Sequence, residues 1–159
     1  MPPTKVIFLD IDGVICNLRN NLEQAENYGL HCQLDPVAIN LINRLCFKTG
    51  AKVVISSSWA SFHGLGATRL ALEVAGMQNK YFHKDGMTPR ESSDRGQQIL
   101  DWLAKHPEIE NFCILDDDNF DIRPYEKCEP YFVQTDGEEG LLLKDYKKCL
   151  KLLGSEDDL

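Results

Sequence analysis

The sequence predicts a three-layer α/β protein in which helices cover both faces of a central parallel sheet. Short, continuous apolar runs, typical of strands buried on both faces, alternate along the chain with segments of helical periodicity. Polar residues follow three of these runs directly, at the place where open parallel sheets bind their ligands. The length of 159 residues suits a single domain, residues 1–159, with a core of its own.

The first strand is predicted at residues 6–9, where four apolar residues lead into an acidic turn. Residues 16–34 follow as a polar, aperiodic segment, which we expect to be an extended loop with a short helix around 22–28. This segment is a candidate for a small lid. A helix is then predicted between Asp35, a suitable N-cap followed by proline, and Gly50, a suitable C-cap.

The middle of the chain predicts a second buried strand at 52–55. A helix is expected at 65–75, closed by Gly76, and its apolar residues are Leu70, Leu72 and Val74. A brief third strand is expected at 80–83. Residues 84–93 contain Asp-Gly and Thr-Pro pairs, which predict a loop.

The last third predicts a helix at 94–106, with Asp94 and Gln97 in the positions of a capping box. A buried strand is expected at 112–115 and a final strand at 131–133. An amphipathic helix at 141–153 turns its lysines outward, and the acidic residues 154–159 form a flexible tail. Parallel strands joined through helices imply right-handed crossovers.

Composition excludes several functional classes. The net charge of −8 argues against a general nucleic-acid binder, because phosphate contacts come from basic surfaces. No apolar stretch reaches the roughly 18 to 20 residues of a membrane span, and no signal peptide is recognisable. We therefore expect a cytoplasmic protein. Most of the six cysteines should be reduced, with Cys46, Cys113 and Cys149 filling the core.

Three polar clusters carry the chemistry. Asp10 and Asp12 follow the first strand, Ser56-Ser57-Ser58 follow the second, and Asp116-Asp117-Asp118 follow the strand at 112–115. In a parallel sheet all three clusters reach the same edge. Several carboxylates packed together repel one another unless a cation compensates them. Oxygen ligands of this kind suit Mg²⁺.

The three clusters resemble signatures of the haloacid dehalogenase (HAD) superfamily. Residues 8–14, Phe-Leu-Asp-Ile-Asp-Gly-Val, are similar to the first signature in its DxDGV phosphatase form. Residues 54–56 resemble the second signature and 114–117 the fourth, in the expected order. The resemblance implies a Rossmann-like HAD core without a cap or with a minimal one.

Further residues resemble the small HAD domains of Swiss-Army-knife RNA-repair proteins. They are Ile-Ser-Ser-Ser-Trp at 55–59, residues 95–103, and Leu-Asp-Asp-Asp at 115–118. In that group an arginine usually follows the Ser-Ser-Trp segment, whereas Ala60 stands there in this chain.

The resemblance implies roles for the two acids of the first signature and for the hydroxyl of the second. Asp10 would be the nucleophile that forms an aspartyl-phosphate. Asp12 would serve as general acid and then general base, and its backbone carbonyl would bind the metal. Ser56 would hydrogen-bond the transferring phosphoryl group, with Ser57 as the alternative.

The remaining roles concern a basic residue and the metal ligands. Arg95 is our first candidate for the basic third signature that contacts nucleophile and phosphate, and Lys84 and Arg90 are alternatives. Asp117 is expected to complete the metal ligands, and Asp116 to bind the metal or orient its neighbours.

The sequence therefore predicts a Mg²⁺-dependent phosphatase that acts on a phosphorylated nucleotide, nucleic-acid end, phosphoprotein or small metabolite. A small-molecule enzyme of the 5′(3′)-nucleotidase kind is one alternative, and a catalytically inactive phosphate- or metal-binding module is another. A receiver domain is disfavoured by Asp12, since receivers need only an acceptor aspartate and a metal. The oligomeric state is left open.

Overall fold

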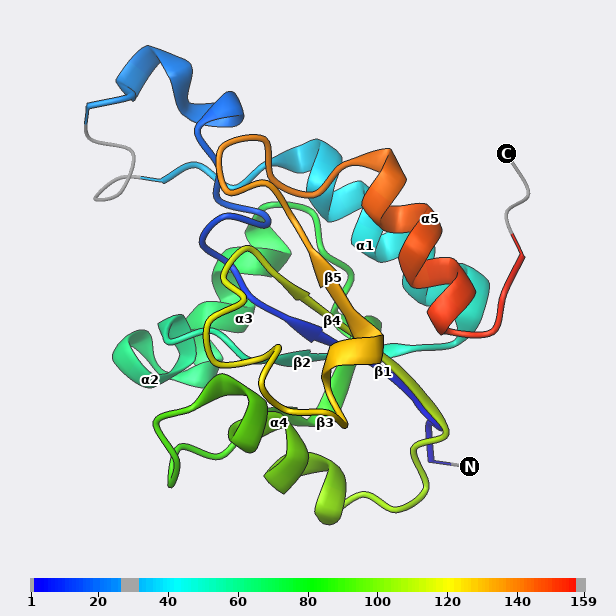
Figure 1. The fold of residues 1–159 in the computed structure, drawn as a ribbon. Helices are drawn as coiled ribbons and strands as arrows, with labels where there is room; N and C mark the ends of the chain where they lie inside the picture. Colours follow the sequence, from blue (N-terminus) through cyan, green and yellow to red (C-terminus); the bar gives the residue numbers. More distant parts are fainter. Residues whose placement is uncertain (1, 27–31, 157–159) are drawn as a thin grey trace.

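A computed structural model, which describes residues 2–26 and 32–156, confirms the predicted α/β class. One sheet contains five parallel strands in the order β3-β2-β1-β4-β5 (Figure 1). The strands are β1 (Lys5–Leu9), β2 (Lys52–Ile55), β3 (Phe82–Met87), β4 (Asn111–Asp116) and β5 (Phe132–Gln134). The predicted first strand thus lies in the centre of the sheet, hydrogen-bonded to β2 on one side and β4 on the other.

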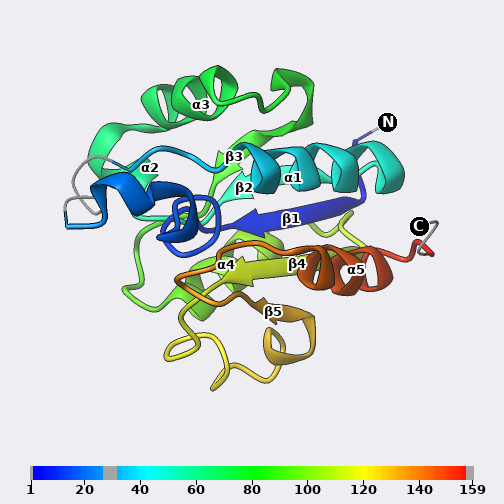
Figure 2. The ribbon, with the colours of Figure 1, turned by 90° about the horizontal axis from the view of Figure 1, so that it is seen from above.

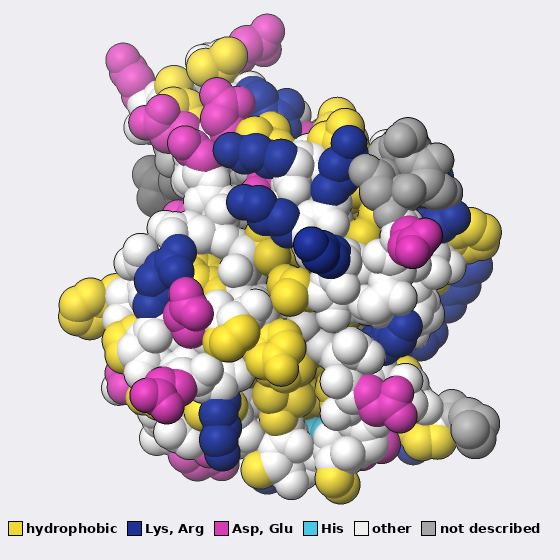
Figure 3. Space-filling view, turned by 45° about the vertical axis from the view of Figure 1, so that its right-hand side comes forward, with side chains coloured by type: hydrophobic (Ala, Val, Ile, Leu, Met, Phe, Trp, Pro, Cys, Tyr) yellow, Lys and Arg dark blue, Asp and Glu magenta, His cyan; other side chains and the backbone are white. Residues whose placement is uncertain are grey.

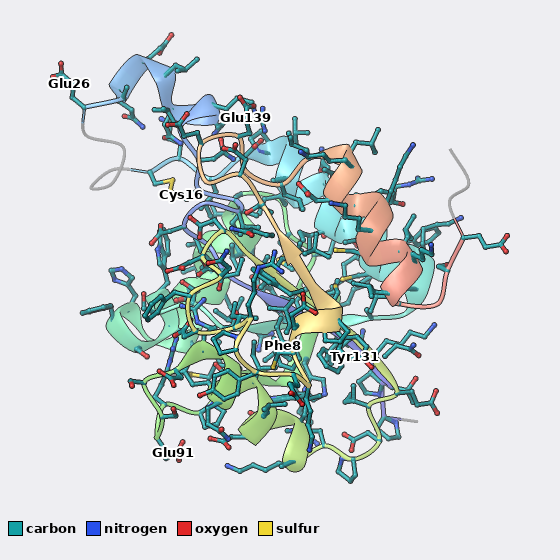
Figure 4. The ribbon with its side chains drawn as sticks, in the orientation of Figure 1. Phe8, Cys16, Glu26, Glu91, Tyr131 and Glu139 are labelled. Carbon is teal, nitrogen blue, oxygen red and sulfur yellow. A yellow bond between two sulfur atoms is a disulfide. The ribbon has the colours of Figure 1, made fainter. Side chains whose placement is uncertain are left out.

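Helices cover both faces of this sheet (Figures 1 and 2). Helices α1 (Pro36–Thr49), α3 (Leu65–Val74) and α5 (Leu143–Leu152) contribute to one apolar cluster, and α4 (Arg95–Ala104) contributes to the other. Successive residues of β1 alternate between the two clusters, as successive side chains of a strand must. Phe8, labelled in Figure 4, makes an edge-to-face contact with Trp102 of α4 at 5.4 Å between ring centroids. A strand buried on both faces explains the uninterrupted apolar run.

Local signals set the bounds of α1. The Asp35 carboxylate accepts hydrogen bonds from the backbone N–H groups of Val37 (2.9 Å) and Ala38 (3.4 Å). Gly50 ends the helix in the left-handed region, at φ +76°, where a residue with a Cβ would be strained. Both predicted caps of this helix are confirmed.

The third strand was predicted too early in the chain. Residues Asn79–Tyr81 form a 3₁₀ turn, and β3 begins at Phe82 and includes four residues of the predicted loop at 84–93. Because β3 is an edge strand, its pairing with β2 through Phe82 and Met87 defines it better than its mostly polar sequence does. Edge strands carry polar side chains without losing a core face.

The region between β2 and β3 also differs from the prediction. Residues Trp59–His63 form a short helix, α2, whose five residues show no periodicity that sequence reading could detect. In α3, Leu72 is buried as expected, whereas Leu70 and Val74 are exposed. Thr68 is the other buried residue of α3. The apolar residues of this helix therefore lie on two different faces.

The predicted capping box at the start of α4 is wrong. The Asp94 carboxylate accepts a hydrogen bond from the Tyr125 hydroxyl at 2.7 Å, and Gln97 donates to Asp101. The backbone N–H of Arg95 instead donates to Asp121 Oδ2 at 2.8 Å. A residue 26 positions away thus supplies the cap, which local sequence spacing cannot reveal.

A disulfide and side-chain hydrogen bonds to a neighbouring helix hold the segment at 16–34 in place. Its short helix is a 3₁₀ helix, η1 (Arg19–Gln24), rather than a helix at 22–28; residues 27–31 lie outside the described residues. Cys16 and Cys32 form a disulfide (Figure 4), which was not predicted. The side chains of Asn17 and Arg19 both bond to the Asp35 carboxylate. The segment is thereby tied to the start of α1.

The C-terminal helix α5 is amphipathic, as expected. Tyr146, Cys149 and Leu150 are buried, and its lysines face outward. Figure 3 shows Lys and Arg side chains gathered on this side of the molecule. The other free cysteines, Cys46, Cys113 and Cys128, are buried too. Residues 157–159 of the predicted acidic tail lie outside the described residues.

Within the described part of the chain, no helix is long and apolar enough to cross a membrane.

Candidate active site

The first site element is the turn that follows β1. The backbone N–H of Asp10 donates to the carbonyl of Leu115 at 3.0 Å, so Asp10 extends the pairing of β1 with β4. The chain then turns, and the N–H groups of Ile15 and Cys16 both donate to the carbonyl of Ile11. Gly13 takes φ +80° in this turn. The pairing leaves Asp10 beside the end of β4.

Three carboxylates converge at this edge of the sheet. Asp10, Asp116 and Asp117 each present an oxygen atom, and the three atoms lie within 4.8 Å of one another. Asp10 and Asp116 are almost completely buried, and Asp117 is half-buried. Oxygen donors with this charge suit a hard divalent cation such as Mg²⁺. Gathering them in a buried position is costly without a cation, so the donor set fits such an ion.

The electrostatics of the cluster agree with that fit. Burial raises the pKa of Asp10, and Arg95 opposes the rise. Burial and the neighbouring Asp10 carboxylate raise the pKa of Asp116 to about 8. Both carboxyl groups thus hold a proton more tightly than usual while no metal competes for their oxygens.

Arg95 is the basic residue that reaches these acids. Its Nη1 lies 2.5 Å from Asp116 Oδ2 and 3.4 Å from Asp10 Oδ1. The carboxylates of Asp10, Asp116 and Asp121 raise its pKa, although burial opposes the rise. The geometry places our first candidate for the basic third signature against the expected nucleophile.

The two alternatives lie elsewhere. Arg90 donates to the backbone carbonyls of Ser56 and Ser57 and to Gln98 Oε1, so its guanidinium holds the turn after β2. Burial lowers the pKa of Arg90, as does Arg95. Lys84 is exposed on β3 and lines a separate cavity with His83 and His106.

The serines after β2 differ in what their hydroxyl groups do. Ser57 Oγ accepts a hydrogen bond from the backbone N–H of Trp59 at 3.2 Å, which supports the start of α2. The Oγ of Ser56 is buried and has no hydrogen-bond partner among the described residues. A buried hydroxyl without a partner is costly and available to a ligand. The contacts favour Ser56 over Ser57 as the phosphate donor, and that role stays a prediction.

Asp12 lies at the edge of the site, exposed and outside the three-acid cluster. Its Oδ1 accepts a hydrogen bond from the indole Nε1 of Trp59 at 3.2 Å. The metal contact expected from its backbone carbonyl stays a prediction. The sequence indicated that Trp59, which follows the serine cluster, could line a pocket or pack under a loop, and the hydrogen bond to Asp12 places it at the site.

The loop after β5 also shapes the site, and sequence reading missed it. Thr135 Oγ1 donates to the carbonyl of Gly13 at 2.8 Å. A Cβ at Gly137 would lie 3.0 Å from Asp117 Oδ2. A signal was present, because Thr135 and Gly137 follow the last strand just as the other clusters follow theirs.

A second group of potential ligands, His83, His106 and Glu108, lies around the separate cavity. His83 Nδ1 accepts a hydrogen bond from the backbone N–H of Asp85 at 2.9 Å. In the neutral ring the proton is therefore on Nε2, which leaves His83 without a lone pair for a cation. The acid cluster is the better cation site.

Comparison with known families agrees with the geometry. The family model described as "HAD domain in Swiss Army Knife RNA repair proteins" matches residues 6–146. The matched range contains the serine cluster, Arg95 and all the acids of the site. No match was found among curated proteins.

Gly13→Ala should weaken Mg²⁺ binding. A Cβ at Gly13 would lie 2.2 Å from both Cγ and Oδ2 of Asp117, so the carboxylate must move. Gly50→Ala is the matched control, because Gly50 has a similar φ and no atom within 4 Å of its Cβ position. Gly50→Ala should lose about 1–2 kcal/mol of unfolding free energy in urea for its left-handed backbone, and Gly13→Ala should lose more because Asp117 must also move. Calorimetric titration should show weaker Mg²⁺ binding in Gly13→Ala alone, and equal affinities would contradict the placement of the metal.

Mg²⁺ affinity should rise with pH up to about 8. Between the ordinary carboxyl pKa of 3.8 and the raised value of about 8, folded metal-free protein holds a proton on Asp116 that the unfolded chain has released. Its unfolding free energy therefore falls as pH rises through this window. Mg²⁺ must displace the proton, so its association constant should fall about tenfold for each pH unit below 8. Titrations at pH 6, 7 and 8 that gave one affinity would refute this.

Proposed function

This chain belongs to the family of HAD domains found in Swiss Army Knife RNA repair proteins, and we propose that it is a Mg²⁺-dependent phosphomonoester phosphatase. The match to a HAD domain family supports a phosphatase-type hydrolase as the reaction class. The observation that carries the proposal is the meeting of Asp10, Asp116, Asp117 and Arg95 at the carboxyl edge of the sheet.

Asp10 is the nucleophile in this proposal. One of its carboxylate oxygens attacks phosphorus, and the bond between phosphorus and the leaving oxygen breaks. Asp12 gives its proton to that oxygen, and the product is an alcohol. Asp12 then takes a proton from water, the water oxygen attacks the aspartyl-phosphate, and Asp10 is released together with inorganic phosphate. The two acids lie in different surroundings: Asp10 is almost completely buried, whereas Asp12 is exposed and open to water.

The chain's other residues bind and orient the phosphoryl group. Arg95 supplies positive charge beside Asp10, and the hydroxyl of Ser56 supplies a hydrogen bond. Arg90 positions Ser56 through the carbonyls of the turn. Asp10, Asp116 and Asp117 would hold Mg²⁺, with the backbone carbonyl of Asp12 as a further ligand. When bound, the ion would offset the repulsion between the nucleophile and the phosphate.

The substrate in this proposal is a nucleotide or a nucleic-acid end, as the RNA repair setting of the family suggests. Phosphoproteins and small phosphorylated metabolites are the other phosphoesters that the site chemistry admits, and the expected compartment is the cytoplasm. A nucleotidase acting on free nucleotides is the alternative enzyme. A catalytically inactive phosphate- or metal-binding module is less well supported, because Asp10 and Asp12 are both present.

Asp10→Asn should abolish phosphatase activity. With Mg²⁺ and p-nitrophenyl phosphate, we expect kcat to fall roughly a thousandfold or more, because the amide cannot attack phosphorus. Asp118→Asn is the control. Asp118 is exposed, and its side-chain oxygen caps the N–H of Phe120, which an asparagine can also do. Chelation with EDTA should remove activity and added Mg²⁺ restore it. Activity retained by Asp10→Asn would exclude the mechanism.

Asp12→Ala should discriminate between leaving groups. The phosphate ester of an alkyl alcohol needs its leaving oxygen protonated, so we expect its hydrolysis to slow about 10²- to 10⁴-fold. p-Nitrophenolate leaves without a proton, so the first-turnover burst with p-nitrophenyl phosphate should be affected far less. Mg²⁺ affinity should change little, since the carboxylate of Asp12 lies outside the acid cluster. If the first turnover slowed equally for both esters, Asp12 would not be the general acid.

A further inference from the structure

We propose that an apolar groove lined by Trp59, the residue that bonds to Asp12, binds an aromatic ring in the leaving group of the substrate, and that Trp59 forms the wall between this groove and the reacting atoms. The inference rests on the phosphatase function proposed above and specifies its substrate. The same ring could belong to a nucleobase or to a phenyl group, and the experiment below separates the two.

Trp59 links the groove to the chemistry. Its indole Nε1 donates to Asp12 Oδ1 at 3.2 Å. A general acid has to come within hydrogen-bond distance of the oxygen that it protonates. The leaving group therefore lies beside Asp12 and within reach of the indole ring. An edge-to-face contact with His63, at 5.6 Å between centroids, supports the ring from the end of α2.

The groove leads away from Trp59 along α3 and has a volume of about 510 Å³. This volume falls within the range of small-molecule sites. Its walls are apolar side chains, among them Leu34, Trp59, Ala67, Leu70, Ala71 and Val74. The four that belong to α3 are spaced i, i+3, i+4 and i+7, which places them on one face of the helix. None of the described lining residues is charged.

This face of α3 is not needed for the core. Leu72 and Thr68 are the buried residues of the helix, whereas Leu70 is 61% and Val74 is 81% exposed. An apolar surface that shares Trp59 with the proposed reaction site is suited to an apolar part of the ligand.

The chemistry of the walls favours an aromatic occupant. A flat ring can lie between the alanine side chains and stack on Trp59. A sugar or a small acid would give up its hydration here and find no side-chain partner for its polar groups. Because the groove begins at the residue that contacts Asp12, the occupant we infer is the substrate itself.

Adenosine 5′-monophosphate and ribose 5-phosphate test this inference, because they share the ester bond and the sugar and differ in the base. We expect kcat/KM to be about 5- to 150-fold higher for the nucleotide, the usual effect of stacking one base on an aromatic side chain. Benzyl phosphate and ethyl phosphate form the second pair. A preference in the first pair alone identifies a nucleobase, and a preference in both identifies any aromatic ring.

Two sets of variants connect the preference to the groove. Trp59→Leu should bring the ratio for the nucleotide pair close to one. Trp59→Phe keeps an aromatic ring at this position and should therefore retain much of the ratio. Val74→Asp puts a charge in the groove and should lower the ratio. Val37→Asp, the same change at a residue of α1 that is 55% exposed, should leave it unchanged.

Binding measurements separate this inference from the proposed catalysis. Calorimetry with Asp10→Asn and Mg²⁺ should show tighter binding of the nucleotide than of ribose 5-phosphate, whether or not the wild-type protein hydrolyses either. If the nucleotide binds in a way that depends on Trp59 but is not hydrolysed, the inference about the groove is supported and the proposed phosphatase activity is refuted. Equal kcat/KM and equal binding for both compounds would overturn the groove. So would gel filtration in which Val74→Asp, unlike Val37→Asp, dissociated a dimer, because a second copy would then cover this face.

Discussion

Two buried carboxylates, Asp10 and Asp116, lie side by side at the end of the sheet, and the site depends on how their charge is compensated. Strand β1 pairs with β4 along its whole length, so Asp10, which follows β1, is held next to Asp116, the last residue of β4. Arg95, at the start of α4, compensates this negative charge by forming ion pairs with both acids. Asp121 in turn holds the backbone N–H of Arg95 at the start of that helix. Buried charge of this kind is tolerated only with partners.

Contacts distant in sequence keep the cluster in shape. The hydroxyl of Thr135 holds the carbonyl of Gly13, 122 residues earlier, and so joins the turn after β1 to the loop after β5. Gly13 and Gly137 both approach Asp117 so closely that a side chain at either would press against its carboxylate. The third acid is thus positioned by two glycines, and the strand ends of β1, β4 and β5 act as one unit.

The turn after β2 divides the site into two sides. Within the described part of the chain the buried hydroxyl of Ser56 has no hydrogen-bond partner, while Ser57 supports the short helix that begins with Trp59. Trp59 reaches back to Asp12, the acid that is exposed. Binding of phosphate and recognition of the leaving group would therefore be served by neighbouring residues of the same five-residue stretch.

Much of the fold could be read from the sequence because its signals are local. Continuous apolar runs identified β1, β2 and β4, and Asp35 and Gly50 set the bounds of α1. The same reading failed for β3 and α2. An edge strand is defined by its neighbour in the sheet, and a helix of five residues has too few turns to show a period.

The sequence by itself determined that the acids after β1 and at the end of β4 lie at one edge of the sheet, because the carboxyl ends of parallel strands lie together. The tertiary structure decided that Asp12 stands apart from the cluster of Asp10, Asp116 and Asp117. Only the tertiary structure decided which basic residue faces them. Arg90 and Arg95 are five positions apart, yet one holds backbone carbonyls and the other holds Asp10 and Asp116. It also decided that Asp121 rather than Asp94 caps α4, and that Trp59 bonds to Asp12. Each of these features depends on a contact between segments far apart in the chain. A local sequence pattern does not show which distant segments come together in the folded protein.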